Sequence, residues 1–233
     1  FAQIEPRVLF CADGYRYAGK EIDCLERVRD IVGAIPSVER VIVVPLLREA
    51  PDLGGGPRAV TWTGFASAGR GVPLAFERLP FSHPLYIMYS SGTTGLPKCM
   101  VHGAGGTLLQ HLKEHRLHLD LQRDERLFYF TTCGWMMWNW LVSALAAQAT
   151  IVLYDGAPAT PANASVLWDL AAEERVTVFG TSAKFLALSE KAGLAPVRTH
   201  DLSALRAILS TGSPLAEHSF DYVARDVKPG VML

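Results

Sequence analysis

Segments that favour β-strands alternate with segments that favour α-helices, and this alternation constrains the fold more than any other feature of the chain. Short apolar runs, many of them β-branched, fall at residues 8–12, 41–44, 84–88, 99–102, 127–130, 150–154, 176–179 and 205–209. Apolar residues at helical spacing fall at residues 21–35, 62–69, 108–119, 137–147, 164–175, 183–191 and 215–224. The alternation predicts an α/β fold, layered, with mostly parallel sheets flanked by helices.

The composition is that of a globular protein. Hydrophobic residues make up 49% and charged residues 19% of the 233 residues, enough for one large or two small domains. The formal net charge is −1, so no basic excess indicates nucleic acid or an anionic membrane surface as a partner. No apolar run approaches the ~18–20 residues that a membrane-spanning helix needs. We therefore expect neither a nucleic acid nor a membrane as a partner.

The four cysteines are Cys11, Cys24, Cys99 and Cys133. None forms a Cys-x-x-Cys pair, and their spacing fits no zinc site. We expect reduced thiols, in or near the core of a cytoplasmic protein.

The two ends of the chain resemble cuts in a longer protein. The chain begins with Phe1 rather than Met, and residues 229–233 have the pattern of a turn followed by the opening of a strand. We interpret residues 1–233 as an internal fragment, with a possible subdomain boundary near residues 73–84.

The loop at residues 89–98 has the most specific chemistry. Its glycines let backbone N–H groups turn toward a ligand, its hydroxyls add short donors, and Lys98 adds a flexible positive charge. This combination suits a polyphosphate, although the spacing is not that of a Walker A motif. The alternative is an ordinary surface loop rich in glycine, serine and threonine. The predicted phosphate-binding residues are Ser90, Ser91, Gly92, Thr93, Thr94, Gly95 and Lys98.

Three further loops follow predicted strands, where parallel sheets carry their ligand sites. In residues 131–138, Trp135 follows a glycine and is placed to wall an apolar or planar pocket, whereas Trp138 and Trp140 fit core packing equally well. In residues 180–184, Thr181 or Ser182 fits a helix N-cap. Residues 210–215 resemble a strand-to-helix turn.

One short motif suggests a competing function. His111, Glu114 and His115 fit the H-x-x-E-H pattern of a zinc protease. The segment is otherwise polar and basic and has no evident third ligand, so we predict a solvated helix face instead. His102, just after the phosphate loop, fits either a structural or a substrate-adjacent role.

The string Ser-Gly-Thr-Thr-Gly-x-Pro-Lys resembles the phosphate loop of the adenylate-forming superfamily, which includes acyl-CoA synthetases, luciferases and peptide-synthetase adenylation domains. The four loops occur in the order used by these enzymes, and the resemblance covers essentially the whole chain as part of their N-terminal AMP-binding domain. Residues 98–102, 110–115, 134–140 and 180–184 most resemble the acetoacetyl-CoA synthetases within the superfamily.

The resemblance implies ATP-dependent activation of acetoacetate, followed by transfer to CoA, with release of AMP and pyrophosphate. It assigns roles to residues of all four loops and of an earlier segment. These are catalytic roles for Lys98 and Thr94, an adenine-side loop of Gly212, Ser213 and Pro214, an acyl pocket of Trp135, Met136 and Thr181, and CoA contacts from Arg16 and Lys20. The superfamily often has an acidic or larger residue in place of Ser213.

Other parts of the machinery implied by the resemblance would lie beyond Leu233. These are the loop near Mg²⁺, the ribose-binding aspartate and the mobile C-terminal domain, so we expect the chain alone to be inactive and to hold no metal ligand. Two alternatives stay open: an acetyl- or propionyl-CoA synthetase, and a nucleotide-binding fragment without catalysis.

Overall fold

Two units, each built around its own parallel sheet, make up the chain. The computed structural model describes residues 1–54, 58–90, 95–160 and 162–233. The first unit comprises Phe1–Pro80 and Tyr89–Met100, and the second comprises Phe81–Met88 and Val101–Leu233. The predicted α/β fold with parallel sheets flanked by helices is confirmed.

The first unit contains a three-stranded parallel sheet in the order β1-β4-β5. The strands predicted at residues 8–12 and 41–44, with a helix between them, are confirmed as β1, β4 and α1. The elements are a 3₁₀ helix (Ala2–Ile4), β1 (Val8–Ala12), β2 (Gly14–Tyr17), β3 (Lys20–Asp23), α1 (Leu25–Ala34), β4 (Arg40–Val44), β5 (Ala59–Thr61) and α2 (Trp62–Ser67). A further two-stranded sheet, β6 (Pro84–Ser90) and β7 (Lys98–Gly103), contains residues of both units.

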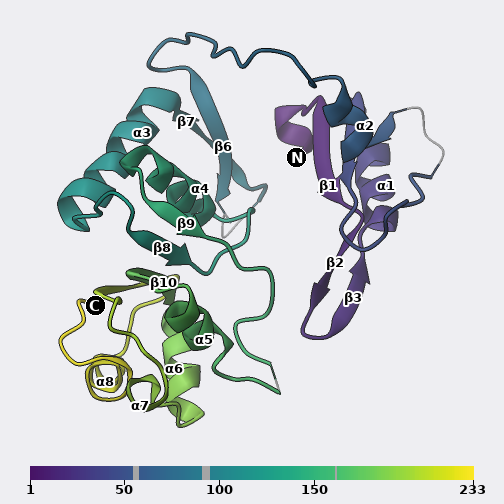
Figure 1. Cartoon of the computed structure of the whole chain (residues 1–233). Helices are drawn as coiled ribbons and strands as arrows, with labels where there is room; N and C mark the ends of the chain where they lie inside the picture. Colours follow the sequence, from purple (N-terminus) through teal and green to yellow (C-terminus); the bar gives the residue numbers. More distant parts are fainter. Residues whose placement is uncertain (55–57, 91–94, 161) are drawn as a thin grey trace. The chain divides into compact units, whose positions relative to one another are not determined.

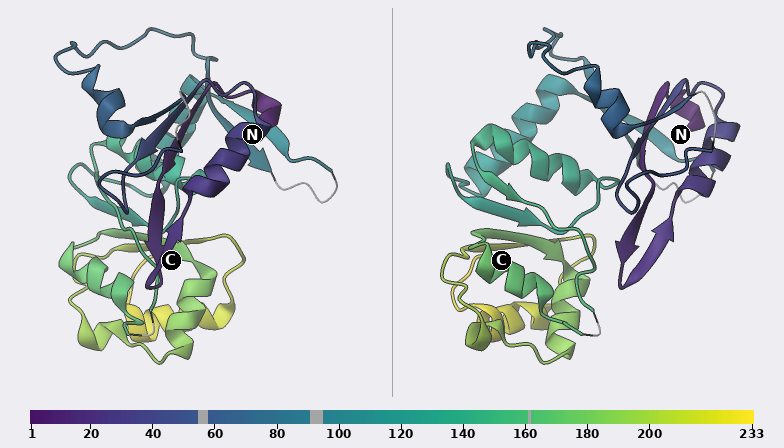
Figure 2. Two further views of the ribbon diagram at one scale, coloured as in Figure 1. Left: turned by 90° about the vertical axis from the view of Figure 1, so that its right-hand side faces the viewer. Right: turned by 45° about the vertical axis from the view of Figure 1, so that its right-hand side comes forward.

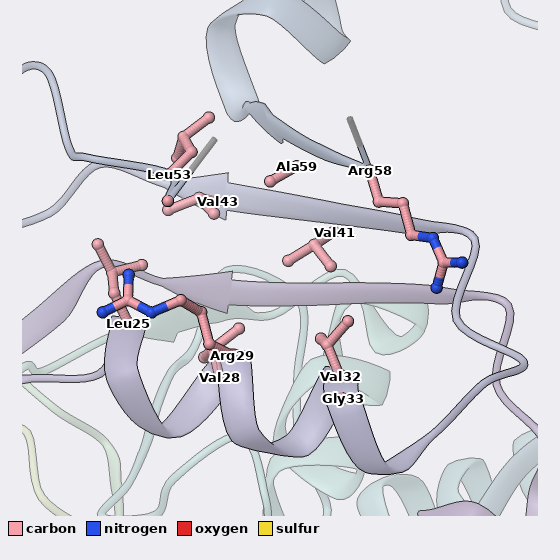
Figure 3. Close-up of a pocket in the computed structure, with 11 residues that line it drawn as sticks. Leu25, Val28, Arg29, Val32, Gly33, Val41, Val43, Leu53, Arg58 and Ala59 are labelled. Carbon is pink, nitrogen blue, oxygen red and sulfur yellow. The ribbon is translucent and has the colours of Figure 1, made fainter. Parts of the chain in front are cut away.

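Helix α1 covers one face of the three-stranded sheet. Figure 3 shows Val28 and Val32 of α1 facing β4, whose Val41 and Val43 belong to the same buried cluster. A cavity of about 290 Å³ lies between α1 and the strands, and its walls are mainly aliphatic.

The start of α1 corrects a prediction. The helix expected over residues 21–35 begins only at Leu25, because the preceding residues form the antiparallel β2–β3 hairpin. The hairpin turns through Ala18 and Gly19, whose φ angles of 49° and 79° are the positive values that a tight two-residue loop requires. Ile22 fits the helical period but pairs across the hairpin instead. In both views of Figure 2 the hairpin extends beyond the three-stranded sheet.

The second unit contains a four-stranded parallel sheet in the order β11-β10-β8-β9. Its strands are β8 (Arg126–Tyr129), β9 (Thr150–Val152), β10 (Val178–Ser182) and β11 (Ala207–Thr211). Its helices are α3 (Ala104–Lys113) with a π-helical turn (Glu114–His118), α4 (Met136–Ser143) with a 3₁₀ turn (Ala144–Ala147), α5 (Val166–Glu173), α6 (Ala183–Lys191), α7 (Pro196–Thr199), and α8 (Glu217–Tyr222) with a π-helical turn (Val223–Val227).

Helices cover both faces of this sheet, as buried parallel sheets require. Helices α3 and α4 lie on one face, where Leu127 and Val178 join a cluster with Trp140. Helices α5 and α6 lie on the other, where Phe179 stacks on Trp168 with ring centroids 4.9 Å apart. Alternate residues of each strand therefore belong to different cores.

The last two strands begin later than predicted. The sequence pattern placed them at residues 176–179 and 205–209, but both start and end at least two residues further on. Gly180, Thr181, Ser210 and Thr211, expected in loops, lie inside strands because each pairs with a neighbouring strand.

An ion pair stabilises the edge of this sheet where the strands begin. The Arg206 guanidinium donates to both carboxylate oxygens of Glu125 and, at 2.9 Å, to the carbonyl oxygen of Leu119. Burial alone would raise the pKa of the Glu125 carboxyl, but these bonds hold it below its ordinary value. The pair thus joins the start of β11 to the segment that enters β8.

Gly180 occupies the one place in β10 where a side chain does not fit. It pairs in register with Tyr129, whose buried ring covers it, so a Cβ atom would overlap the ring. The Tyr129 hydroxyl donates to the carbonyl oxygen of Thr181 at 3.5 Å. Burial raises the pKa of Tyr129 to about 12, so the phenol remains a donor at neutral pH.

The helix face carrying His111 and His115 is buried, which corrects the predicted solvated face. His111 is 4% and His115 0% exposed, because α3 and its π-helical turn pack against α4 and its 3₁₀ turn. His115 Nε2 lies 3.1 Å from the Trp140 carbonyl oxygen and 3.0 Å from Ser143 Oγ. Trp140 Nε1 in turn donates to Glu114 at 2.8 Å.

Arg116, one of the basic residues that suggested an exposed helix face, has structural partners. Arg116 donates to the carbonyl oxygens of Leu121 and Ala147 at 3.0 and 2.8 Å. The positive charge of Arg116 therefore indicates hydrogen bonds at the end of this helix, and not a fully solvated helix face.

The contact between Gly180 and Tyr129 predicts a loss of stability on Gly180→Ala. The added methyl group overpacks the sheet, and the free energy of unfolding should fall by about 1–3 kcal/mol. Chemical denaturation of the protein that contains this chain measures the change. Gly106→Ala, in α3 with open space around its Cβ position, is the matched control and should be neutral or stabilising. Equal effects of the two substitutions would contradict the packing argument.

The buried His115 predicts acid sensitivity. Burial is the main cause that lowers its pKa from 6.5 to about 4, so the folded protein keeps it neutral while the unfolded chain takes up a proton below about 6.5. Stability should fall as the pH decreases from about 6.5 to about 4, by at most about 3 kcal/mol from this residue. Denaturation curves across this range test it.

His115→Gln should flatten that pH dependence, while His118→Gln, at an exposed position of the same turn, should leave it unchanged. Parallel curves for the native protein and His115→Gln would exclude His115 as the cause.

Candidate functional site

Three of the predicted loops begin side by side in the second unit. Strands β8, β10 and β11 are parallel neighbours, and Gly180 aligns with Tyr129 while Ser182 aligns with Thr211. The chain therefore leaves all three strands at the same edge of the sheet. Such an edge is where parallel α/β sheets bind ligands.

The loop after β8 presents exposed apolar side chains at this edge. Trp135 is the N-cap residue of α4, with its side chain 65% exposed, and Met136 follows it with 45% exposed. Trp140 is buried and Trp138 packs against the same core, so the core-packing alternative is confirmed for these two. Of these three tryptophans, Trp135 is thus the one available to a ligand.

Thr181 lies inside β10 and is 1% exposed. Its hydroxyl finds no hydrogen-bond partner among the described residues, and neither does that of Ser210, its cross-strand neighbour. Ser182 accepts a bond from the N–H of Phe185 at 3.2 Å, so the N-cap interpretation is confirmed for Ser182.

The turn after β11 depends on Gly212. Its φ angle of 91° is in the range that favours glycine, and it turns the chain from β11 toward α8. Ser213 and Pro214 follow on the surface. The three residues predicted for the adenine side therefore form an exposed turn at the same edge as Trp135.

The predicted phosphate loop joins β6 to β7. Ser91, Gly92, Thr93 and Thr94 lie outside the described residues. Ser90 ends β6, Gly95 has a φ angle of 89°, and Lys98 begins β7 with an exposed side chain. This loop belongs to the first unit, whereas the other three belong to the second.

Arg16 and Lys20 lie on the exposed β2–β3 hairpin of the first unit. Arg16 donates twice to Glu21 across the hairpin, at 3.0 and 2.7 Å. Such a solvated ion pair contributes little stability, so the guanidinium can exchange this partner for a phosphate. Lys20 is exposed beside it.

No cluster in the described part of the chain has the composition of a metal site. Within it, no three His, Cys, Asp or Glu side chains are grouped to hold an ion. Cys11 and Cys24 are half-buried and free, as expected for near-core thiols, but Cys99 and Cys133 are exposed, which corrects that expectation. His102 is half-buried on β7, and both of its interpretations stay open. None of the helices in the described residues combines the length and the hydrophobicity needed to cross a membrane.

Sequence reasoning did not identify Tyr129 as a residue of this edge, and it placed Ser210 in the loop at residues 210–215 rather than in a strand. Tyr129 ends β8 and its hydroxyl reaches β10, while Ser210 aligns with Thr181. A polar or phenolic group near the last position of an otherwise apolar strand was the signal for both.

Comparison with known proteins gives a consistent result. The family model of the AMP-binding enzymes matches residues 1–229. The acetoacetyl-coenzyme A synthetase of Rhizobium meliloti (strain 1021) is 53% identical over 237 residues, aligned with 100% of this chain and 36% of the relative. The acetoacetyl-CoA synthetase of Gallus gallus is 50% identical over 238 residues, with the same shares.

A solved structure of acetoacetyl-CoA synthetase from Streptomyces lividans matches with a TM-score of 0.86 and 44% identity, and the match covers 95% of this chain and 33% of that one. The chain thus spans about a third of the length of the relatives that it matches. The match of the family model to residues 1–229 shows that the chain belongs to the family of AMP-binding enzymes.

Proposed function

We propose that the protein containing this chain is an acetoacetate–CoA ligase that forms AMP. The observation that carries the proposal is the alignment of the whole chain, at 53% and 50% identity, with two acetoacetyl-CoA synthetases. The exposed Trp135 and Met136 at the loop edge of the second sheet support it, because a short acyl chain needs an apolar wall.

The proposed reaction has two halves. In the first, a carboxylate oxygen of acetoacetate attacks the α-phosphorus of ATP, which forms acetoacetyl-AMP and releases pyrophosphate. In the second, the sulfur of CoA attacks the acyl carbonyl carbon, the bond to AMP breaks, and the thiol proton passes to solvent. Both halves depend on positioning and on charge stabilisation by the enzyme.

The loop between β6 and β7 is the proposed site for the β- and γ-phosphates. Ser90 and Gly95 flank its centre, and the loop is completed by residues outside the described part, among them Thr94. Lys98 neutralises the charge of the leaving pyrophosphate. An ammonium about 4 Å from a phosphate oxygen gains about 4 kcal/mol at an intermediate dielectric constant.

The second sheet supplies the proposed contacts to the acyl group and to adenine. Trp135 and Met136 wall the acyl group, and the Thr181 hydroxyl, which has no partner among the described residues, supplies a donor at the same edge of the sheet. The turn of Gly212, Ser213 and Pro214 lies along the adenine. Its backbone rather than the short Ser213 side chain makes these contacts.

The β2–β3 hairpin is the proposed contact for CoA. Arg16 and Lys20 are exposed cations on it, and the phosphates of CoA are the anions they would meet.

Mg²⁺ normally accompanies ATP, and no three metal-ligating side chains are grouped together in the described residues. We expect its protein ligand outside this chain. The free cysteines support a cytoplasmic location.

Pyrophosphate–ATP exchange by the whole protein tests the substrate. Exchange with acetoacetate should be at least about tenfold faster than with acetate or propionate, because the shorter acids lose the contacts that the proposed site makes to the longer chain and its keto group. Faster exchange with acetate would favour the acetyl-CoA synthetase alternative. ATP binding without exchange for any of the acids would favour a nucleotide-binding protein without catalysis.

Lys98→Ala should slow this exchange by about 10²–10³-fold, since it removes the positive charge that stabilises the negative charge developing on pyrophosphate. Lys191→Ala, at an exposed position at the end of α6, is the matched control and should exchange at the native rate. Native exchange by Lys98→Ala would remove Lys98 from the mechanism.

A further inference from the structure

Asp13 is a fully buried carboxylate that the proposed chemistry does not use. It lies between β1 and β2 and is 0% exposed. Its Oδ1 accepts the N–H groups of Leu46 and Leu47 at 2.7 and 3.0 Å, and its Oδ2 accepts that of Arg48 at 2.9 Å. Burial alone would raise the pKa of this carboxyl, but the three N–H groups and the Arg48 guanidinium hold it below its ordinary value. The group is therefore a satisfied buried anion.

The backbone of Asp13 joins three segments. Its N–H donates to the carbonyl oxygen of Val44 at the end of β4, and its carbonyl oxygen accepts the N–H of Cys24 just after β3. Next to it, a Cβ atom at Gly14 would lie 2.5 Å from the carbonyl oxygen of Ile22. The base of the hairpin is thus packed tightly against its surroundings.

Arg48 links the two ends of the hairpin. Its Nη2 lies 2.7 Å from Asp23 Oδ2 and its Nη1 lies 3.8 Å from Asp13 Oδ2. Asp23 Oδ1 also accepts the N–H of Leu25, the first residue of α1. One guanidinium therefore connects the residue before β2 with the last residue of β3. We call Asp13, Arg48 and Asp23 the hairpin anchor.

The hairpin beyond the anchor has little support of its own. Strands β2 and β3 pair only with each other among the described strands. All of its residues except Gly14 and Ile22 are exposed. An isolated two-stranded hairpin is only marginally stable in water, so its direction depends on how its base is held.

We propose that the hairpin anchor is a positioning group for the second half-reaction. It holds the β2–β3 hairpin in the orientation in which Arg16 and Lys20 meet the phosphates of CoA. This inference rests on the proposed function, because it needs the hairpin to bind CoA. The proposed role gives the anchor no contact with substrate, so its removal should affect the CoA step through geometry alone.

Arg48→Gln in the whole protein is the informative variant, since it leaves Asp13 with its three N–H donors. The KM for CoA in thioester formation should rise about tenfold, because the hairpin cations lose their orientation. Acetoacetate-dependent pyrophosphate–ATP exchange, which needs no CoA, should change by less than about twofold. Arg48→Lys keeps the charge and should give an intermediate KM.

Arg7→Gln is the matched control. Arg7 pairs with Glu39 at 2.8 Å in the same unit, but the pair is exposed and lies where β1 and β4 begin, at the opposite end of these strands from the hairpin. Its loss should leave the KM for CoA and the exchange rate at native values.

Three results are decisive. An unchanged KM for CoA in Arg48→Gln would overturn the positioning role. An equal loss of exchange and of thioester formation would reduce the anchor to a general stabilising element. If the unaltered protein shows no pyrophosphate–ATP exchange with any of the acids tested, the proposed function fails instead. Calorimetric titration with CoA then tests the anchor directly, with about tenfold weaker binding expected for Arg48→Gln.

Discussion

The parallel pairing of β10 between β8 and β11 is the constraint on which the second unit depends. The register sets Gly180 beside Tyr129 and Ser182 beside Thr211. Because the three strands run in one direction, the chain must leave each of them at the same edge. The three loops are thus brought together by backbone hydrogen bonds, without any need to contact one another. A single antiparallel strand here would carry its loop to the opposite edge.

The edge of this sheet where the strands begin and the edge where they end differ in how their polar groups are paired. Where the strands begin, Arg206 is paired with Glu125, and the Lys228 ammonium donates to the carbonyl oxygens of Leu202, Ser203 and Leu205. Where they end, the buried hydroxyls of Thr181 and Ser210 find no partner among the described residues. Charges that are fully paired stabilise one edge. Polar groups that are left unpaired make the other edge suited to a ligand, since a buried donor without a partner costs free energy until one arrives.

Periodicity identified most helices and strands because burial imposes it, and the helix predicted over residues 183–191 coincides with α6. It failed where pairing or packing between distant segments decides. Gly180 and its hydroxyl-bearing neighbours favour loops locally, but two flanking strands supply the hydrogen bonds that keep them extended. His111 and His115 sit among polar residues, and only the approach of α4 buries them. Trp135 was recognisable as a ligand-facing residue because it follows a glycine on the loop side of a helix, whereas the only local sign at Tyr129 was its phenolic group at the end of an apolar strand.

The first unit also separates a fully hydrogen-bonded charge from charges that stay exposed to solvent. Asp13 and Gly14 predict only a turn in the sequence, because the donors that surround Asp13 come from residues 46–48, more than thirty positions away. The bonded carboxylate lies at the base of the hairpin, and the exposed cations lie beyond it. A cation that must meet a mobile substrate loses little by being solvated, but the segment that carries it must have a fixed direction. Burying one charge completely and leaving the others in water meets both requirements, since the buried charge gives rigidity and the solvated charges stay available for exchange.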